Sequence, residues 1–100
     1  MKWDIQTVGF SAQQELIDYT KNKVEGLQKF YDQIVGAEVY LKLVQDDKNN
    51  TKVADIKLNI PGNDIMGSST TDGFEKSINE SIEKLKGQLR KLKTKQKSHL

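Results

Sequence analysis

The sequence predicts an α+β domain of order β-α-β-β-β-α, in which a four-stranded sheet carries both helices on one face. Four segments alternate apolar and polar residues, as strands do when only one of their faces is buried. Two longer segments repeat apolar residues every three or four positions, which is the spacing of a helix with one buried stripe. The length of 100 residues with 35% hydrophobic content suffices for one core. A single sheet covered on one side buries all of these apolar faces.

The first strand and the first helix are predicted from the N-terminal third of the chain. Alternation from Trp3 to Gly9 predicts the strand. Ser11, with Gln14 three residues later, is placed to cap a helix whose end is marked by Gly36. The apolar stripe of this helix consists of Leu16, Thr20, Val24, Leu27 and Tyr31, widened by Ile17 and Phe30.

Three further strands follow, joined by short turns. Residues 39–43 and 54–60 alternate strictly, and the polar run 45–50 predicts the turn between them. The pair Pro61-Gly62 fits a type II turn into a fourth strand at 65–71. The inward side of this strand is small, which indicates either a helix packed close by or an edge position; it consists of Ile65, Gly67, Ser69 and Thr71.

The final helix is predicted over about residues 73–95, capped by Asp72 with Glu75 three residues later. The order of residues 96–100 stays open. One apolar stripe should anchor this helix on the sheet; it consists of Phe74, Ile78, Ile82, Leu85, Leu89 and Leu92.

Charge divides the chain into two parts. Residues 1–83 hold nine basic and fourteen acidic side chains, whereas residues 84–100 hold seven basic side chains and no acidic one. One or two cations would serve the helix dipole, and lysine-rich faces aid solubility, but seven without a counter-charge favour a polyanionic partner. At about 100° per residue along a helix, the seven basic side chains fall on the two flanks of the leucine stripe. One flank holds Lys86, Arg90, Lys93 and Lys97, the other holds Lys84, Lys91 and Lys95, and the first helix adds Lys21, Lys23 and Lys29.

The sequence offers little for catalysis or metal binding. It has no cysteine, and the single His99 cannot form a metal site or a catalytic triad alone. Asp46 and Asp47 are interpreted as turn formers rather than metal ligands. An acid–base enzyme using one carboxylate remains an alternative without a candidate dyad. We expect no enzyme activity, cofactor or small-molecule substrate, no membrane segment and no secretion signal, and hence a cytoplasmic protein.

Two segments resemble the ribosome hibernation promoting factors, also called ribosomal subunit interface proteins. They are LIDYTKNKVEGL at 16–27, continuing through FYDQI at 30–34, and IEKLKGQLRK at 82–91 with the lysines after it. The resemblance implies a monomeric short-form factor, since the chain ends at Leu100 without the dimerising domain of the long forms. Such a factor binds the decoding side of the small (30S) ribosomal subunit and blocks translation in stationary phase or stress.

The resemblance also implies which side chains contact ribosomal RNA phosphates. These are Lys23, Lys84, Lys91, Lys93, Lys95 and Lys97, with Lys86 and Arg90 on the neighbouring stripe. The chain departs from the family at Gly87, where an arginine is usual, and at Asn79, where an acid is usual. Whether the protein promotes ribosome pairing or idles single ribosomes is left open.

An alternative interpretation is a double-stranded RNA-binding module, whose α-β-β-β-α order resembles the chain from Ser11 onward. That module carries its lysines at the start of the last helix, where this chain has Asp72 and Glu75. The position of the charges therefore favours the ribosomal factor.

Overall fold

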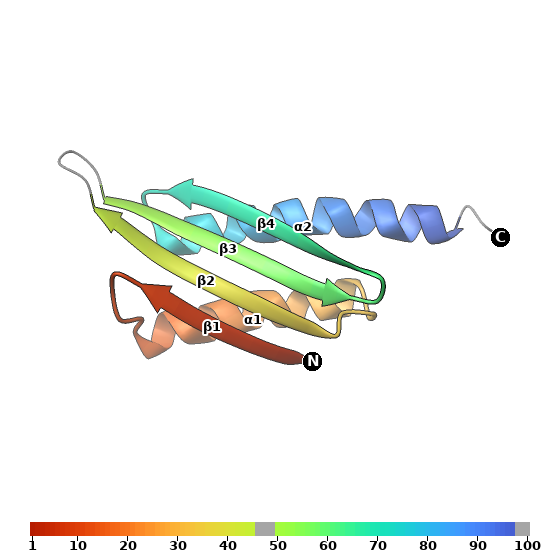
Figure 1. Ribbon diagram of the computed structural model, residues 1–100, viewed down its shortest axis with the longest axis horizontal. Helices are drawn as coiled ribbons and strands as arrows, with labels where there is room; N and C mark the ends of the chain where they lie inside the picture. Colours follow the sequence, from red (N-terminus) through yellow and green to blue (C-terminus); the bar gives the residue numbers. More distant parts are fainter. Residues whose placement is uncertain (46–49, 98–100) are drawn as a thin grey trace.

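The computed structural model describes residues 1–45 and 50–97 and has the predicted order of elements (Figure 1). The strands and helices are β1 (Lys2–Val8), α1 (Gln14–Phe30), β2 (Gly36–Gln45), β3 (Asn50–Ile60), β4 (Asn63–Thr71) and α2 (Phe74–Lys97). The α+β prediction and its β-α-β-β-β-α order are confirmed.

The four strands lie in one mixed sheet in the order β1-β2-β3-β4. β1 pairs with β2 in parallel, because α1 carries the chain back between them, and the two other pairs are antiparallel hairpins. Both helices cover the same face of the sheet, as Figure 1 shows, and leave the other face open. The two edges of the sheet are therefore β1 and β4.

The core fills the space between the sheet and the two helices. It is made of the predicted apolar faces, with Val24 and Leu27 from α1 and four residues of the α2 stripe fully or almost fully buried. Their partners on the central strands are equally buried. The largest contribution comes from β2 and β3, with Ala37, Val39, Leu41, Ala54, Ile56, Leu58 and Ile60.

β4 is both an edge strand and the place where α2 comes closest to the sheet, so both expectations for its small residues hold. A Cβ added to Gly67 would stand 2.5 Å from the carbonyl oxygen of Ser81. Two serines of α2 face the sheet and bond its main chain: Ser77 Oγ donates to the carbonyl of Lys52 at 2.7 Å, and Ser81 Oγ to that of Ala54 at 2.7 Å. Small side chains on both elements allow this close packing.

The turn between β3 and β4 has the predicted geometry. It consists of Pro61 and Gly62 alone, since β3 ends at Ile60 and β4 begins at Asn63. Gly62 has a φ of 87°, the left-handed value that the third position of a type II turn requires.

Both predicted helix caps were wrong. α1 begins at Gln14, and Gln13 occupies the N-cap position without a side-chain hydrogen bond, so Ser11 lies too early to cap it. α2 begins after Gly73, whose carbonyl accepts the amide hydrogen of Ser77 at 2.9 Å. Asp72 instead forms an exposed ion pair with Lys76 at 3.6 Å.

The helix ends also differ from the predictions. α1 ends at Phe30, six residues before Gly36, which begins β2. α2 continues to Lys97, beyond the predicted end near residue 95, and projects past the sheet in Figure 1. Leu92 is the last residue of the stripe to pack against the core. No helix in the described ranges is long and apolar enough to cross a membrane.

Candidate nucleic-acid interface

The two helices lie side by side on the sheet and run in the same direction, as Figure 1 shows. Their outer surfaces enclose a shallow groove halfway along. Gly26 of α1 lies in this groove without a side chain, so the helices leave an opening there. The groove is lined by Asn22, Lys23 and Gly26 of α1 and by Asn79, Ile82, Glu83 and Lys86 of α2.

Lys23 and Lys86 therefore face one groove from opposite helices, as their positions in the two helical stripes predict. Lys86 forms an ion pair with Glu83 at 3.7 Å, and both side chains are partly or largely exposed. Lys23 is exposed and lies over the ring of Tyr19, with its ammonium nitrogen 5.5 Å from the ring centroid. The groove thus presents two cations, two amide side chains and the carboxylate of Glu83 to solvent.

Further along α2, two cations share one aromatic ring of α1. The ammonium nitrogen of Lys93 is 4.3 Å from the ring centroid of Phe30, and the guanidinium carbon of Arg90 is 5.7 Å from it. Both distances lie within the range of favourable cation–π contacts. The predicted stripe of Lys86, Arg90 and Lys93 is therefore turned toward α1.

The other flank of α2 lies along β4. Lys84 donates a hydrogen bond to the carbonyl of Ser68, and Gln88 donates one to the carbonyl of Met66 at 2.8 Å. Lys91 follows on this flank and is exposed. The basic side chains of α2 thus lie on two flanks as predicted, but the ammonium group of Lys84 is hydrogen-bonded to β4.

The remaining predicted cations lie away from the groove. Lys21 forms an exposed ion pair with Glu25, one helical turn later, with 4.0 Å between the ammonium nitrogen and a carboxylate oxygen. Lys29 lines a hollow on the β1 side of α1 together with Met1 and Trp3. The side chains of Lys95 and Lys97 lie outside the described residues, although both positions belong to α2.

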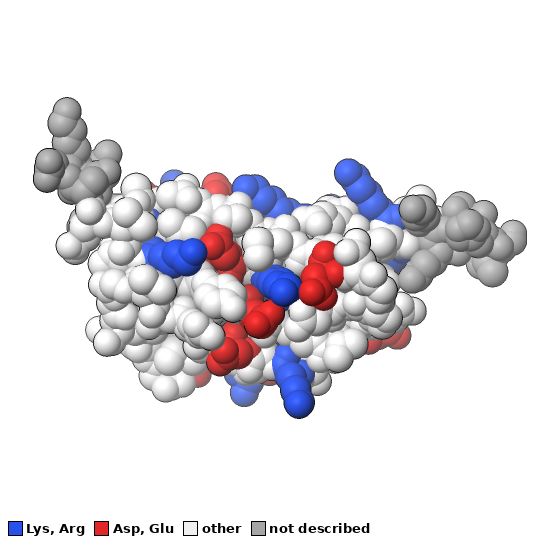
Figure 2. All heavy atoms as spheres, in the orientation of Figure 1, with Lys and Arg blue, Asp and Glu red and all other residues white. Residues whose placement is uncertain are grey.

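The open face of the sheet carries charges that pair with one another. Lys57 lies 3.7 Å from Glu38 and 3.5 Å from Asp64, and Lys42 lies 3.3 Å from Asp55. Figure 2 views this face and shows acidic and basic side chains side by side near its centre. Because these charges largely compensate each other, this face attracts a polyanion much more weakly than the helical face does.

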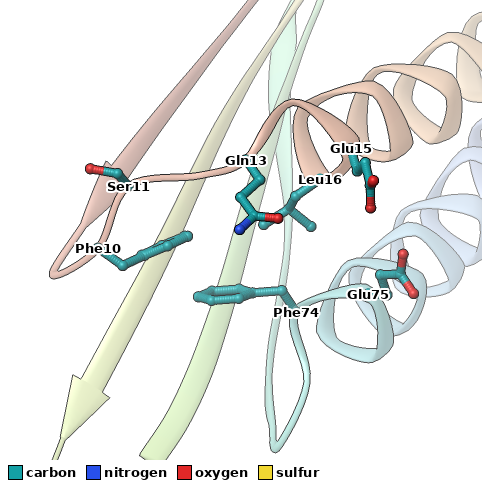
Figure 3. Close-up of a pocket in the computed structure, with 7 residues that line it drawn as sticks. All are labelled: Phe10, Ser11, Gln13, Glu15, Leu16, Phe74 and Glu75. Carbon is teal, nitrogen blue, oxygen red and sulfur yellow. The ribbon is translucent and has the colours of Figure 1, made fainter.

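The end of the molecule where both helices begin is different again. The rings of Phe10 and Phe74 stack with their centroids 4.4 Å apart and form one wall of a small pocket. Glu15 and Glu75 also line this pocket from the first turns of the two helices, and their carboxylates point toward each other in Figure 3. Carboxylates at the N-terminal ends of the two helices interact favourably with the helix dipoles, and they repel phosphate. The basic surface is therefore confined to the middle and the C-terminal half of the helical layer.

Sequence reasoning missed the aromatic and amide members of this surface. Phe30 widens the apolar stripe of α1 as predicted and, like Tyr19, packs half-buried against the core; what the sequence did not indicate is that both rings lie under cations. It gave no role to Asn22 or to the opening at Gly26, since both depend on which part of α2 lies opposite. The helical spacing predicted where the cations lie, but it did not predict the aromatic rings and amide side chains that lie next to them.

Comparison with known proteins identifies the family. The family model described as "Sigma 54 modulation protein / S30EA ribosomal protein" matches residues 3–97. The chain belongs to this family. Its membership confirms the resemblance to the ribosome hibernation promoting factors and favours them over a double-stranded RNA-binding module.

Two solved structures share the fold. A ribosomal subunit interface protein from Coxiella burnetii is 24% identical with a TM-score of 0.80, covering 94% of this chain and 99% of that one. The N-terminal domain of Protein Y from Thermus thermophilus is 18% identical with a TM-score of 0.78, covering 92% of this chain and 99% of that one. At these identities the likeness supports the fold alone.

Within the ranges that the structure describes, no group of three or more histidine, cysteine, aspartate or glutamate side chains could hold a metal ion. Asp46, Asp47 and His99 lie outside these ranges, so their interpretation stays a prediction.

Proposed function

We propose that the protein binds the small (30S) ribosomal subunit on its decoding side, where messenger and transfer RNA would otherwise lie, and blocks translation in stationary phase or stress. Membership of the S30EA ribosomal protein family supports the ribosome as the partner. The site within the ribosome and the physiological condition come from the resemblance in the two helices.

The observation that carries the proposal is the convergence of cations from two helices on one face. Lys23 and Lys86 line the same groove, and Arg90 and Lys93 meet on the ring of Phe30. Structured elements hold these charges at fixed spacing, which suits phosphates along a folded RNA backbone. The opposite face pairs its own charges, so binding should have one orientation.

The proposed mechanism is steric. The domain neutralises ribosomal RNA phosphates with its helical face and fills the channel, without catalysis, cofactor or small-molecule substrate. Contacts to phosphate and sugar fix position without reading sequence, so shape should decide where it binds. We propose that the protein is monomeric off the ribosome and acts in the cytoplasm, where ribosomes work.

Charge reversal tests the proposal. Lys86→Glu, Arg90→Glu and Lys93→Glu together should abolish co-sedimentation with purified small subunits at physiological salt, with circular dichroism and melting temperature close to wild type. Lys2→Glu with Lys76→Glu is the control, because both side chains are exposed and lie outside the groove. Retained co-sedimentation of the triple variant would contradict the assignment of the helical face.

Two further measurements separate the alternatives. The bound wild-type protein should compete with messenger and initiator transfer RNA for the small subunit; simultaneous binding of all three would contradict the steric mechanism. Tight binding to a free RNA duplex, equal to binding of small subunits, would favour a general double-stranded RNA-binding activity instead.

A further inference from the structure

Two cations of α2 converge on one ring instead of separating. Arg90 and Lys93 are three positions apart on the helix, and like charges at this spacing repel each other. Both nevertheless lie over the face of Phe30, with Lys93 Nζ at 4.3 Å and Arg90 Cζ at 5.7 Å from the ring centroid. The negative π face is what keeps this pair together. Two cations held over one ring concentrate positive charge at one point of the helical face.

We propose that Arg90 and Lys93 form a two-cation clamp for one phosphate group of RNA, and that Phe30 is the positioning residue that assembles it. The inference rests on the proposed RNA-binding function and names a subsite within that face. A guanidinium fork and a compact ammonium together suit the several oxygens of one phosphodiester.

The charges of the clamp are available to a ligand. Lys21, Lys76 and Lys86 each have an acidic side chain within 4.0 Å. Arg90 and Lys93 have none among the residues that the structure describes, and both are exposed. A phosphate would therefore bind them without first displacing a carboxylate from either side chain.

The platform under the clamp is fixed by the fold. Phe30 is the last residue of α1, is half-buried and packs against the core cluster. The amide of the next residue, Tyr31, donates to the carbonyl of Leu27 at 2.8 Å, which holds the helix end in place. The clamp thus spans both helices, and its geometry depends on how α1 and α2 pack.

A double-mutant cycle tests the role of Phe30. Phe30→Leu keeps an apolar side chain but removes the π face, so affinity for small subunits should fall about five- to tenfold. Lys93→Gln should lower affinity as well, and the combined variant should lose much less than the product of the two effects. The matched cycle of Phe30→Leu with Lys84→Gln should be multiplicative, since Lys84 lies on the other flank of α2. Phe30→Tyr, which retains a ring, should bind like wild type.

Salt dependence tests the number of phosphates in the clamp. The slope of log affinity against log salt falls by about 0.7 to 0.9 for each phosphate that is no longer neutralised. Arg90→Gln with Lys93→Gln should reduce the slope by about this amount, because both cations hold one phosphate. A reduction of twice that size would show that each cation contacts its own phosphate and would overturn the clamp.

Nuclear magnetic resonance tests the same geometry without ribosomes. The side-chain methylene signals of Lys93 next to its ammonium should be shifted upfield by the ring current of Phe30, and this shift should vanish in Phe30→Leu. A short single-stranded RNA should perturb the Arg90 and Lys93 side-chain signals before those of Lys76.

The outcomes distinguish the two proposals. If the Phe30→Leu protein folds and binds like wild type while Arg90→Gln and Lys93→Gln weaken binding, the clamp is overturned and the proposed function stands. If Phe30→Leu melts early, Phe30→Tyr and the ring-current shift decide instead. If wild type does not bind small subunits, the proposed function fails, and the RNA titration alone decides whether the clamp takes phosphate.

Discussion

The ammonium group of Lys84 donates a hydrogen bond to the main-chain carbonyl of Ser68, at a nitrogen–oxygen distance of 2.5 Å. Gln88, one helical turn later, does the same for Met66. Both acceptors belong to β4, an edge strand whose free polar groups could otherwise pair with another chain. Two polar side chains of α2 therefore protect the edge of the sheet.

Lys84→Ala with Gln88→Ala should expose this edge. Each lost hydrogen bond is worth about 0.5–1.5 kcal/mol, so the free energy of unfolding should fall by about 1–3 kcal/mol in urea titrations. Sedimentation velocity should also show association that grows with protein concentration, since β4 becomes free to pair. Glu80→Ala with Lys91→Ala, at two exposed positions of the same helix, should change neither quantity. Equal behaviour of the two double variants would refute the protective role.

Gly67→Ala should destabilise the contact between β4 and α2. The added Cβ would meet the carbonyl oxygen of Ser81 at 2.5 Å and Leu85 Cγ at 3.0 Å, so the main chain of one element must move. Such overpacking costs about 1–3 kcal/mol of unfolding free energy, measurable by thermal or urea denaturation.

Gly26→Ala is the matched control for this substitution. Nothing lies within 4 Å of its added Cβ, and the position is inside α1, so alanine should stabilise the protein by about 0.5–1 kcal/mol. Opposite signs at the two glycines are the expected result. Stabilisation at both positions would mean that α2 does not approach β4 as closely as the structure places it.

The elements of the fold could be predicted because their signals are local. Alternation and helical stripes depend only on which side chains must be buried, so all six elements were found. The caps failed because Ser11 and Asp72 have the right chemistry one or two positions away from the residue with N-cap geometry. The small residues of β4 left two interpretations, and only the packed structure shows that both apply.

Ser69→Ala should leave the protein as stable as wild type or stabilise it by up to about 1 kcal/mol. The Ser69 hydroxyl is buried and has no hydrogen-bond partner in the part of the chain that the structure describes, so removing it removes a desolvation cost. Ser81→Ala should instead cost about 1–3 kcal/mol, because it leaves the buried carbonyl of Ala54 without the hydroxyl that bonds it at 2.7 Å. Urea unfolding of both variants checks the contrast; a loss at Ser69 equal to that at Ser81 would imply an unseen partner.

The candidate site could be predicted only in part, for a related reason. Helical phase placed Lys86, Arg90 and Lys93 on one side of α2, and this depends on the sequence of α2 alone. That Phe30 lies beneath two of them depends on the packing of α1 against α2, which no spacing within either helix contains. The positions of the cations on α2 could therefore be predicted from the sequence, whereas the position of the Phe30 ring beneath them could not.

Gly87→Arg should strengthen both the helix and binding. A Cβ at this position meets nothing within 4 Å, so the substitution needs no rearrangement, and replacing a helical glycine stabilises α2 by about 1 kcal/mol. An added cation between Lys86 and Arg90 should raise the affinity for small subunits at low salt. If five to seven phosphates are engaged in wild type, the slope of log affinity against log salt is about −4 to −6, and it should steepen by about one for the variant.

Gly87→Gln restores helix propensity without charge and separates the two effects: it should raise the melting temperature alone, with the salt slope unchanged. A gain in affinity for Gly87→Gln as large as that for Gly87→Arg would show that helix stability, and not a phosphate contact, limits binding at this position.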